Sequence, residues 1–222
     1  MYVPAHFAMT EAQVADVLAS GAAGDLVTSG PDGLAATHVP MLFDPDAGPL
    51  GSLVGHLSLV NDQWRPAAER GGVPAMFILH GPGDFVDARW LSRPGAPSVP
   101  TWNYVTVHAW GELVAHRDPD WMLSAVRRLS AAHSDASVDA LPAAEVAALL
   151  RAIVGVELRI TRLEGKAKMS QNKVPEVVGQ VIVGLRSAGS EATADWMEQH
   201  SLPRARAKAD LLAGLRAARP TP

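Results

Sequence analysis

The chain has 222 residues, of which 48% are hydrophobic, no cysteine, and a formal net charge of −4. This length can bury one substantial core, so we expect one main domain with a C-terminal appendage. Without cysteine, disulfides, thiolate metal sites and cysteine nucleophiles are excluded, which suits a reducing cytoplasm. The negative charge gives nucleic acid no general attraction, and no apolar segment approaches the roughly 20 residues that cross a bilayer. We therefore predict a cytoplasmic protein with no membrane-spanning segment, and we do not expect it to bind nucleic acid.

The first half of the chain shows short apolar runs separated by glycine and proline turns, a pattern typical of β-strands. Thr10 can cap a helix over residues 10–20, because Val14 and Leu18 recur at helical spacing. The predicted strands are residues 24–29, 34–43, 51–57, 73–80, 85–91 and 102–116. A short helix over residues 63–70 should end at the glycine pair that follows.

The hydrophobic period changes in the second half of the chain. Residues 119–132, 142–152, 175–186, 192–200 and 203–216 have helical patterns. Residues 154–163 alternate as a strand with one wet face, and residues 164–173 read as a polar loop. Strands that come first and helices that cluster late predict a small antiparallel β-barrel decorated by helices, a mainly β, α+β fold. We expect the barrel domain to span residues 1–188 and a helical appendage to span residues 189–222.

Several catalytic classes lack their sequence signals here. No G-x-G-x-x-G follows a strand, and there is no P-loop, H-x-x-x-H, H-E-x-x-H or G-x-S-x-G. Nucleotide binding by the first two routes, a multi-ligand zinc site and a serine hydrolase are therefore disfavoured. Eight histidines are present, and five of them lie within or beside predicted strands. These five are His6, His38, His56, His80 and His108, and a hydrogen-bonded core position is the ordinary role of each.

Two polar clusters stand out. In VPTWNY, Trp102 and Tyr104 should point to one side of a strand and Asn103 to the other. These rings either fill the core or a dimer interface, or they form a flat wall for a planar cofactor. In EGKAKMSQNK, three lysines, a serine, a glutamine and an asparagine crowd residues 164–173. That segment is either a solvated turn or a donor-rich lid that binds a carboxylate or phosphate.

Five segments carry a family resemblance: YVPAHF, ATHVPMLFD, GHLSLVNDQW, VPTWNYVTVHAWG and EGKAKMSQNK. In this order they resemble the motifs of the PaiB-type family, whose members are described as FMN-binding negative transcriptional regulators. The match runs from Tyr2 to about Leu185. The resemblance implies an FMN-binding split β-barrel and a homodimer with its cofactor sites at the subunit interface.

The chain departs from that family in the third-strand motif, which typically reads G-H-x-A-R-A-N-P-x-W. Leu59 replaces the arginine and Asp62 replaces the proline. An FMN phosphate favours Arg, Lys or a helix N-terminus, so this loss should weaken FMN binding by about 1.5–3 kcal/mol if the arginine holds the phosphate. Arg89 lies in another altered segment and could compensate.

A histidine kept where the cation is lost suits haem b, which needs an axial nitrogen and an apolar slot. The chain in this respect resembles the haem-dependent piperazate synthases, a PaiB-like branch that converts N5-hydroxyornithine to piperazic acid and water by closing an N–N bond. On this hypothesis His56 binds the iron, His38 is the reserve ligand, and a small-molecule substrate binds opposite. The remaining cofactor-binding candidates are Trp102, Asn103 and Asn61. The substrate-binding candidates are Lys166, Arg89, Ser170 and Gln171. The candidate proton donors are Tyr104, His108 and Lys168.

Three alternatives remain: an FMN-binding PaiB-type flavoprotein, a transcriptional regulator, and a haem-degrading enzyme. Absorption spectra separate flavin from haem, and the regulator requires DNA binding that the net charge does not favour.

Overall fold

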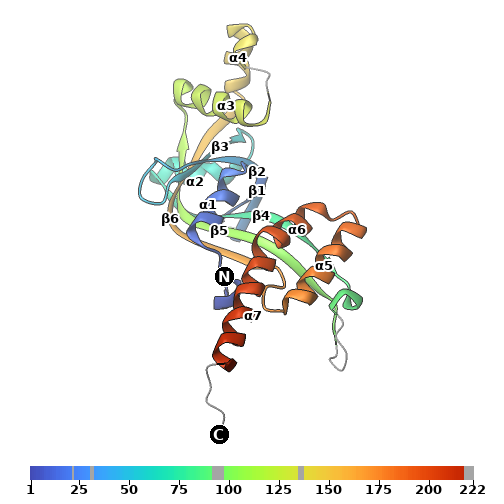
Figure 1. Ribbon diagram of the computed structural model, residues 1–222. Coiled ribbons are helices and arrows are strands. Elements are labelled where there is room, and N and C mark those ends of the chain that lie inside the picture. Colours follow the sequence, from blue (N-terminus) through green and yellow to red (C-terminus); the bar gives the residue numbers. More distant parts are fainter. Residues whose placement is uncertain (22, 31–32, 92–97, 135–137, 218–222) are drawn as a thin grey trace. The chain divides into compact units, whose positions relative to one another are not determined.

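The structure is a computed structural model, and it describes residues 1–21, 23–30, 33–91, 98–134 and 138–217 (Figure 1). Six strands close a barrel in the order β1-β2-β3-β6-β5-β4, and the paired strands β1/β2, β1/β4, β2/β3 and β3/β6 are antiparallel. The strands are β1 Ala23–Gly30, β2 Gly33–Asp44, β3 Ser52–Ser58, β4 Val73–Val86, β5 Thr101–His116 and β6 Ile153–Lys168. The predicted fold class, an antiparallel β-barrel with added helices, is confirmed.

The helices follow the predicted order. They are α1 Glu11–Ala19, α2 Arg65–Arg70, α3 Pro119–His133, α4 Ala143–Leu150, α5 Pro175–Ser187, α6 Glu191–Trp196 and α7 Leu202–Ala217. Short 3₁₀ turns are η1 Ala5–Phe7, η2 Asp62–Trp64, η3 Ala88–Leu91 and η4 Val138–Ala140, and η5 Met197–Ser201 is a π-helical turn. Thr10 caps α1 as expected, because its hydroxyl accepts from the Gln13 amide at 3.2 Å and the Gln13 side chain accepts from the Thr10 amide at 3.0 Å. Among the residues that the structure describes, every helix is too short or too polar to cross a lipid bilayer.

The chain forms two compact units. Unit 1 comprises Met1 and residues 10–79 and 107–164, and unit 2 comprises residues 2–9, 80–106 and 165–222. Strands β4, β5 and β6 continue from one unit into the other. The predicted boundary near residue 188 stays a prediction, and the end of the predicted appendage, residues 218–222, lies outside the described residues.

The core of unit 1 is built by alternation along the strands. Leu53 pairs with Leu158 and Leu57 pairs with Val154 across β3 and β6, and all four side chains are buried. The residues between them point to the other face of the sheet. His56 is one of these outward residues, and its partner across β6 is Gly155.

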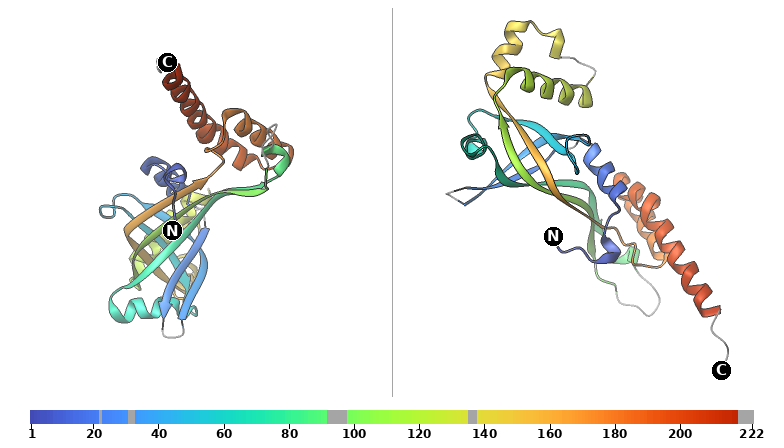
Figure 2. Two further views of the ribbon diagram at one scale, coloured as in Figure 1. Left: turned by 90° about the horizontal axis from the view of Figure 1, so that it is seen from below. Right: turned by 90° about the vertical axis from the view of Figure 1, so that its left-hand side faces the viewer.

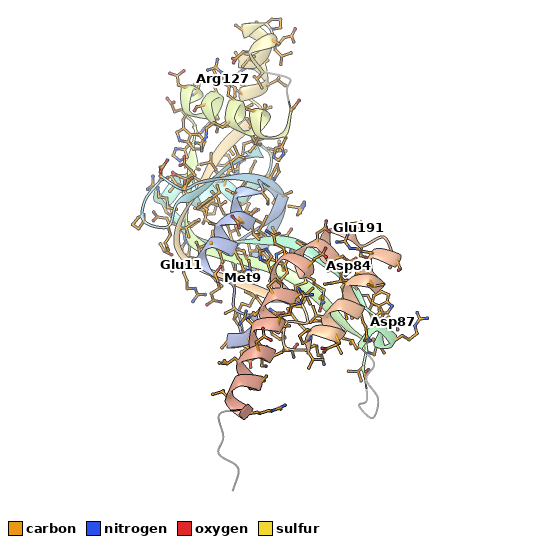
Figure 3. The ribbon with its side chains drawn as sticks, viewed as in Figure 1. Met9, Glu11, Asp84, Asp87, Arg127 and Glu191 are labelled. Carbon is orange, nitrogen blue, oxygen red and sulfur yellow. The ribbon has the colours of Figure 1, made fainter. Side chains whose placement is uncertain are left out.

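Unit 2 is organised around α5. The apolar face of α5 is buried, and α6, α7 and η3 pack against this helix. Helices α5, α6 and α7 lie next to one another in each view (Figure 1, Figure 2). Gly184 lets the Trp90 indole approach, since a Cβ there would lie 2.2 Å from the ring. Asp84 on β4 accepts hydrogen bonds from Ser190, at 2.9 Å, and from Thr193 (Figure 3). These contacts tie the start of α6 to the strand.

The sequence prediction was wrong about two segments. Residues 73–80 and 85–91 were expected as separate strands, but β4 is continuous from Val73 to Val86, and residues 88–91 form η3. The glycines between these two segments do not form a turn. Gly81 instead allows β5 to approach closely, because a Cβ there would lie 2.9 Å from the Cβ of Val105. The polar loop expected from residue 164 is, as far as Lys168, the end of β6.

Gly111→Ala should destabilise the barrel. A Cβ at Gly111 would lie 2.0 Å from the carbonyl oxygen of Arg159, which is backbone and cannot rotate away. Overpacking of this kind costs about 1–3 kcal/mol, and urea unfolding measures it. The matched control is Gly179→Ala in α5, where a Cβ meets nothing within 4 Å. The control should stabilise by about 0.5–1 kcal/mol because alanine favours helix. Equal effects of the two substitutions would contradict the close approach.

Candidate functional site

The histidine of the third-strand motif lies on the outer face of unit 1. His56 is half-buried, and burial lowers the pKa of its imidazole below the usual value. Within the part of the chain that the structure describes, this ring makes no hydrogen bond. Burial therefore favours the neutral imidazole of His56, which is the form that binds iron or accepts a proton.

The strand position beside His56 is covered by a side chain from α3. A Cβ on Gly155 would lie 2.2 Å from the Trp121 ring, so the indole rests directly on the glycine. That indole stacks on His116 with centroids 3.9 Å apart and an interplanar angle of 10°, and the His116 Nε2 lies 3.1 Å from a Glu157 carboxylate oxygen. The outer surface next to His56 is thus already occupied by an aromatic pair.

The loop after β3 is fastened to β1 and β2 by side-chain amides. The Asn61 amide donates to the Thr37 hydroxyl at 2.8 Å, and that hydroxyl donates to the Gln63 side-chain oxygen at 2.6 Å. The Gln63 amide donates in turn to the Leu26 carbonyl at 2.8 Å. Asn61 also accepts from the Gln63 backbone amide at 3.0 Å. Asn61, expected to contact a cofactor, therefore shapes this loop.

The charges on the same loop are balanced locally. Asp62 accepts from the Arg65 guanidinium at 2.5 Å, and both side chains are exposed. His38, the reserve ligand on β2, has its Nδ1 2.9 Å from an Asp25 carboxylate oxygen, again at the surface. Arg65 therefore offsets the negative charge of Asp62, and neither pair adds net positive charge to the loop.

Unit 2 holds a cluster of two lysines and two tyrosines, which we call the lysine–tyrosine cluster: Tyr2, Tyr104, Lys166 and Lys168. Lys166 and Lys168 lie two residues apart on β6 and share a face. The Lys166 ammonium lies 5.5 Å from the Tyr104 ring centroid and 6.0 Å from that of Tyr2, and the Lys168 ammonium lies 5.9 Å from Tyr104. Lys168 also donates to the Trp102 carbonyl at 2.5 Å and to the Thr101 hydroxyl.

The cluster carries positive charge without a counter-ion. Among the described residues, neither lysine is paired with a carboxylate. Burial lowers the pKa of Lys168, and the neighbouring Lys166 ammonium lowers it further, while Tyr104 acts in the opposite direction. Two ammonium groups that repel each other form a site that an anion would stabilise.

An aromatic surface belongs to the same unit. Trp102 is 57% exposed, and its ring meets Phe85, which is 48% exposed, edge to face with centroids 6.3 Å apart. Exposed aromatic pairs are costly in water and usually mark a surface that a ligand or another chain covers. The alternative left open for Trp102, that it fills the core of this chain, is not what the structure shows.

The polar residues after Lys168 are buried and bonded within the chain. The Asn103 amide donates to the Met197 sulfur at 3.2 Å and its oxygen accepts from the Ser170 hydroxyl at 3.1 Å. The Gln171 side chain bonds the Met169 amide at 2.8 Å and the Ala167 carbonyl at 2.5 Å. Ser170 has a positive φ of 59°. These three side chains therefore hold the turn that follows Lys168, and their predicted contact with cofactor or substrate stays a prediction.

Two further candidates, Arg89 and His108, contact other residues than those of the clusters described above. Arg89 is exposed and binds Asp87 through two nitrogens at 2.7 and 3.0 Å, which lowers the pKa of that carboxyl to about 2. His108 lies in unit 1 on β5, with its ring centroid 5.4 Å from that of Trp110. Tyr2 and Phe85 were not singled out from the sequence. Alternation through EGKAK, read as a strand, would have placed both lysines on one face.

Within the described residues, no group of three or more His, Asp or Glu side chains could hold a metal ion. A haem iron needs only one imidazole, so this finding leaves His56 as a candidate.

The barrel and its appended helices define the class: a split β-barrel of the kind found in flavin-binding proteins. A family model described as "Putative FMN-binding domain" matches residues 1–162, and the chain therefore belongs to this family. It is 29% identical over 178 residues to "Protease synthase and sporulation protein PAI 2" of Bacillus subtilis, which covers 78% of this chain and 83% of that protein.

Two solved structures share the fold. The FAD and haem binding protein from Mycobacterium smegmatis has a TM-score of 0.54 and 18% identity, covering 72% of this chain and 71% of that chain. The flavocytochrome Anf3 from Azotobacter vinelandii has a TM-score of 0.52 and 14% identity, covering 71% and 67%. At these identities the likeness shows the fold alone. The predicted family is thus confirmed as far as FMN-binding domains, and the haem-dependent branch stays a prediction.

Proposed function

We propose that the protein is an FMN-binding flavoprotein. This is one of the alternatives that the sequence left open, and we now rank it ahead of the haem-dependent enzyme. The observation that carries the proposal is the lysine–tyrosine cluster, where two ammonium groups share a face of β6 and have no carboxylate partner among the residues that the structure describes. Membership of the FMN-binding family supports the same cofactor.

The cluster suits the phosphate end of FMN. A phosphate monoester carries close to two negative charges and offers three acceptor oxygens, so two ammonium groups neutralise it. Lys168 is already fixed by the Trp102 carbonyl and Thr101 hydroxyl, and it loses little rotamer freedom when an anion binds. The pKa of Lys168 is lowered chiefly by burial and further by the Lys166 ammonium, and a bound anion would act against both effects by stabilising the charged lysine.

The exposed Trp102 and Phe85 rings suit the flat isoalloxazine. When bound, that ring system supplies hydride and one-electron transfer chemistry. The chain's own contribution is to hold the phosphate, to shield one face of the ring from water, and to offer the Lys168 ammonium and Tyr104 hydroxyl as hydrogen-bond donors. The small-molecule substrate stays unassigned.

FMN and riboflavin provide a sharp test because they differ only in the phosphate. Lys166→Met and Lys168→Met should each weaken FMN binding by about 1.5–3 kcal/mol, roughly ten- to a hundredfold, and leave riboflavin binding nearly unchanged. Fluorescence titration measures both affinities. The control is Lys208→Met on α7, outside the cluster, which should change neither. Equal affinity of the wild type for FMN and riboflavin would contradict the phosphate assignment.

A second candidate function rests on His56. Its neutral, half-buried imidazole has no hydrogen-bond partner among the described residues, and such a ring can ligate haem iron. Similar barrels whose names include both FAD and haem, or a flavocytochrome, support the idea that the fold can accommodate a haem group. The Trp121–His116 stack beside Gly155 stands against an open porphyrin slot on this face.

On this second reading, haem b would supply an iron centre for N–N bond formation in N5-hydroxyornithine, as the resemblance to piperazate synthases implies. His56, in unit 1, would hold the cofactor. The resemblance also implies substrate binding by Lys166 and proton donation by Tyr104, His108 or Lys168, and these roles stay predictions.

Haem titration tests this reading directly. If it holds, the wild type should give a sharp Soret band near about 400 nm, and His56→Ala should abolish or strongly shift it. His38→Ala is the matched control and should leave the band in place. A Soret band untouched by His56→Ala, or no band at all, would remove the second candidate while leaving the FMN proposal intact.

We also propose a homodimer, as the family resemblance implies, with Trp102 and Phe85 near the contact. Trp102→Glu should shift sedimentation velocity toward the monomer, because a charge placed in an apolar contact is costly to desolvate. Leu149→Glu on α4, where the side chain is 58% exposed, is the control and should not. A monomeric wild type would contradict the proposal.

A further inference from the structure

Unit 1 contains a cavity of about 330 Å³ that is open to solvent and plays no part in the proposed flavin site. It lies among the end of β3, the beginning of β6 and helices α3 and α4. Its apolar walls include Leu59, Met122, Leu150 and Ile153. Two arginines, Arg117 and Arg151, also line it. An apolar cavity with two cations differs from an ordinary packing defect, which has no polar lining.

Both guanidinium groups are available to a ligand. The Arg117 guanidinium carbon lies 5.8 Å from the centroid of the Trp64 ring, and among the described residues its N–H groups donate no hydrogen bond. Among the described residues, neither Arg117 nor Arg151 forms an ion pair with a carboxylate. The acid next to Arg117, Asp118, is instead engaged as the cap of α3, accepting from the Trp121 amide at 2.8 Å.

The size and lining of the cavity limit the kind of ligand. Its volume lies at the small end of ligand pockets, which span roughly 300–1,000 Å³. A bare phosphate would leave the four apolar walls uncovered in water, whereas a hydrocarbon would leave the two arginines without an anion. A compact molecule with an apolar body and one carboxylate satisfies both features.

We propose that this cavity is a binding site for a small amphiphilic carboxylate, with the carboxylate held by Arg117 and Arg151 and the apolar body against Leu59, Met122, Leu150 and Ile153. The site is separate from the lysine–tyrosine cluster, since all its residues belong to unit 1. It requires no cofactor and therefore does not depend on the flavin proposal.

Isothermal titration calorimetry with sodium octanoate tests the site on the full-length protein. Octanoate should bind, whereas acetate, which lacks the apolar body, and octylammonium, which has the opposite charge, should bind at least tenfold more weakly. Arg117→Gln and Arg151→Gln should each weaken octanoate binding about five- to tenfold, and the double variant should bind octanoate no better than 1-octanol.

Two further variants keep the result interpretable. Arg70→Gln, at the end of α2 and outside the cavity, is the charge control and should leave octanoate binding unchanged. Ala147→Phe places a ring at the cavity wall without altering charge, and it should block octanoate and 1-octanol alike. If the arginine variants unfold, as thermal melting would show, Ala147→Phe still decides the question.

The proposal is overturned if octanoate fails to bind at millimolar concentration, if octylammonium binds equally well, or if Ala147→Phe leaves binding unchanged. FMN titration of the same variants separates the two sites. Arginine variants that lose octanoate but retain FMN support independent sites, and a failure of FMN binding in the wild type does not affect the octanoate result.

Discussion

The charge on one strand is the constraint from which the proposed function follows. β6 begins among buried valines and leucines in unit 1 and ends in unit 2 with two lysines on one face. Burial of an ammonium group is unfavourable, and a second ammonium nearby adds to the cost, as the lowered pKa of Lys168 reflects. The fold retains this arrangement through Tyr104, whose ring lies near both ammoniums, and through the hydrogen bonds of Lys168 to residues 101 and 102. A strained positive cluster of this kind is most simply explained by an anionic ligand that relieves it.

The buried polar side chains around the cluster have a different role. Asn103, Ser170 and Gln171 are almost fully buried. The Ser170 hydroxyl donates to Asn103, and the Gln171 side chain bonds the Met169 amide and the Ala167 carbonyl. A buried amide left unsatisfied costs about 1–3 kcal/mol, so these contacts specify the turn after β6. That turn in turn keeps Lys168 against the strand. Residues that look like ligand donors in the sequence can thus act by positioning the lysine.

Much of the fold could be predicted from periodicity, and the exceptions have physical causes. The capped α1 and the long β5 follow from short-range patterns, which local physics determines. The continuous β4 was missed because His80-Gly81-Pro82-Gly83 has turn composition, whereas Gly81 serves the close approach of Val105, a contact between distant residues. The lysines of β6 were read as a loop because lysine disfavours strands, although Tyr104 and Tyr2 flank Lys166 there. The sequence predicted which residue types form the candidate site, but it did not predict which side chains are exposed. Trp102 lies at the surface, and Asn103 beside it is buried.

The loss of a cation from the third-strand motif does not by itself decide between flavin and haem. The positive charge that a phosphate requires need not come from the position of Leu59. The structure shows that the chain carries unpaired positive charge on β6, and that Asp62 is offset by Arg65. Conversely, His56 can bind iron only through a ring nitrogen that a metal can reach, and Trp121 covers the neighbouring strand position, Gly155. A phosphate can be bound by cations from any element that reaches it, whereas haem would need open space beside a ring nitrogen of His56. The requirement for haem is therefore stricter, and this is why we propose flavin ahead of haem.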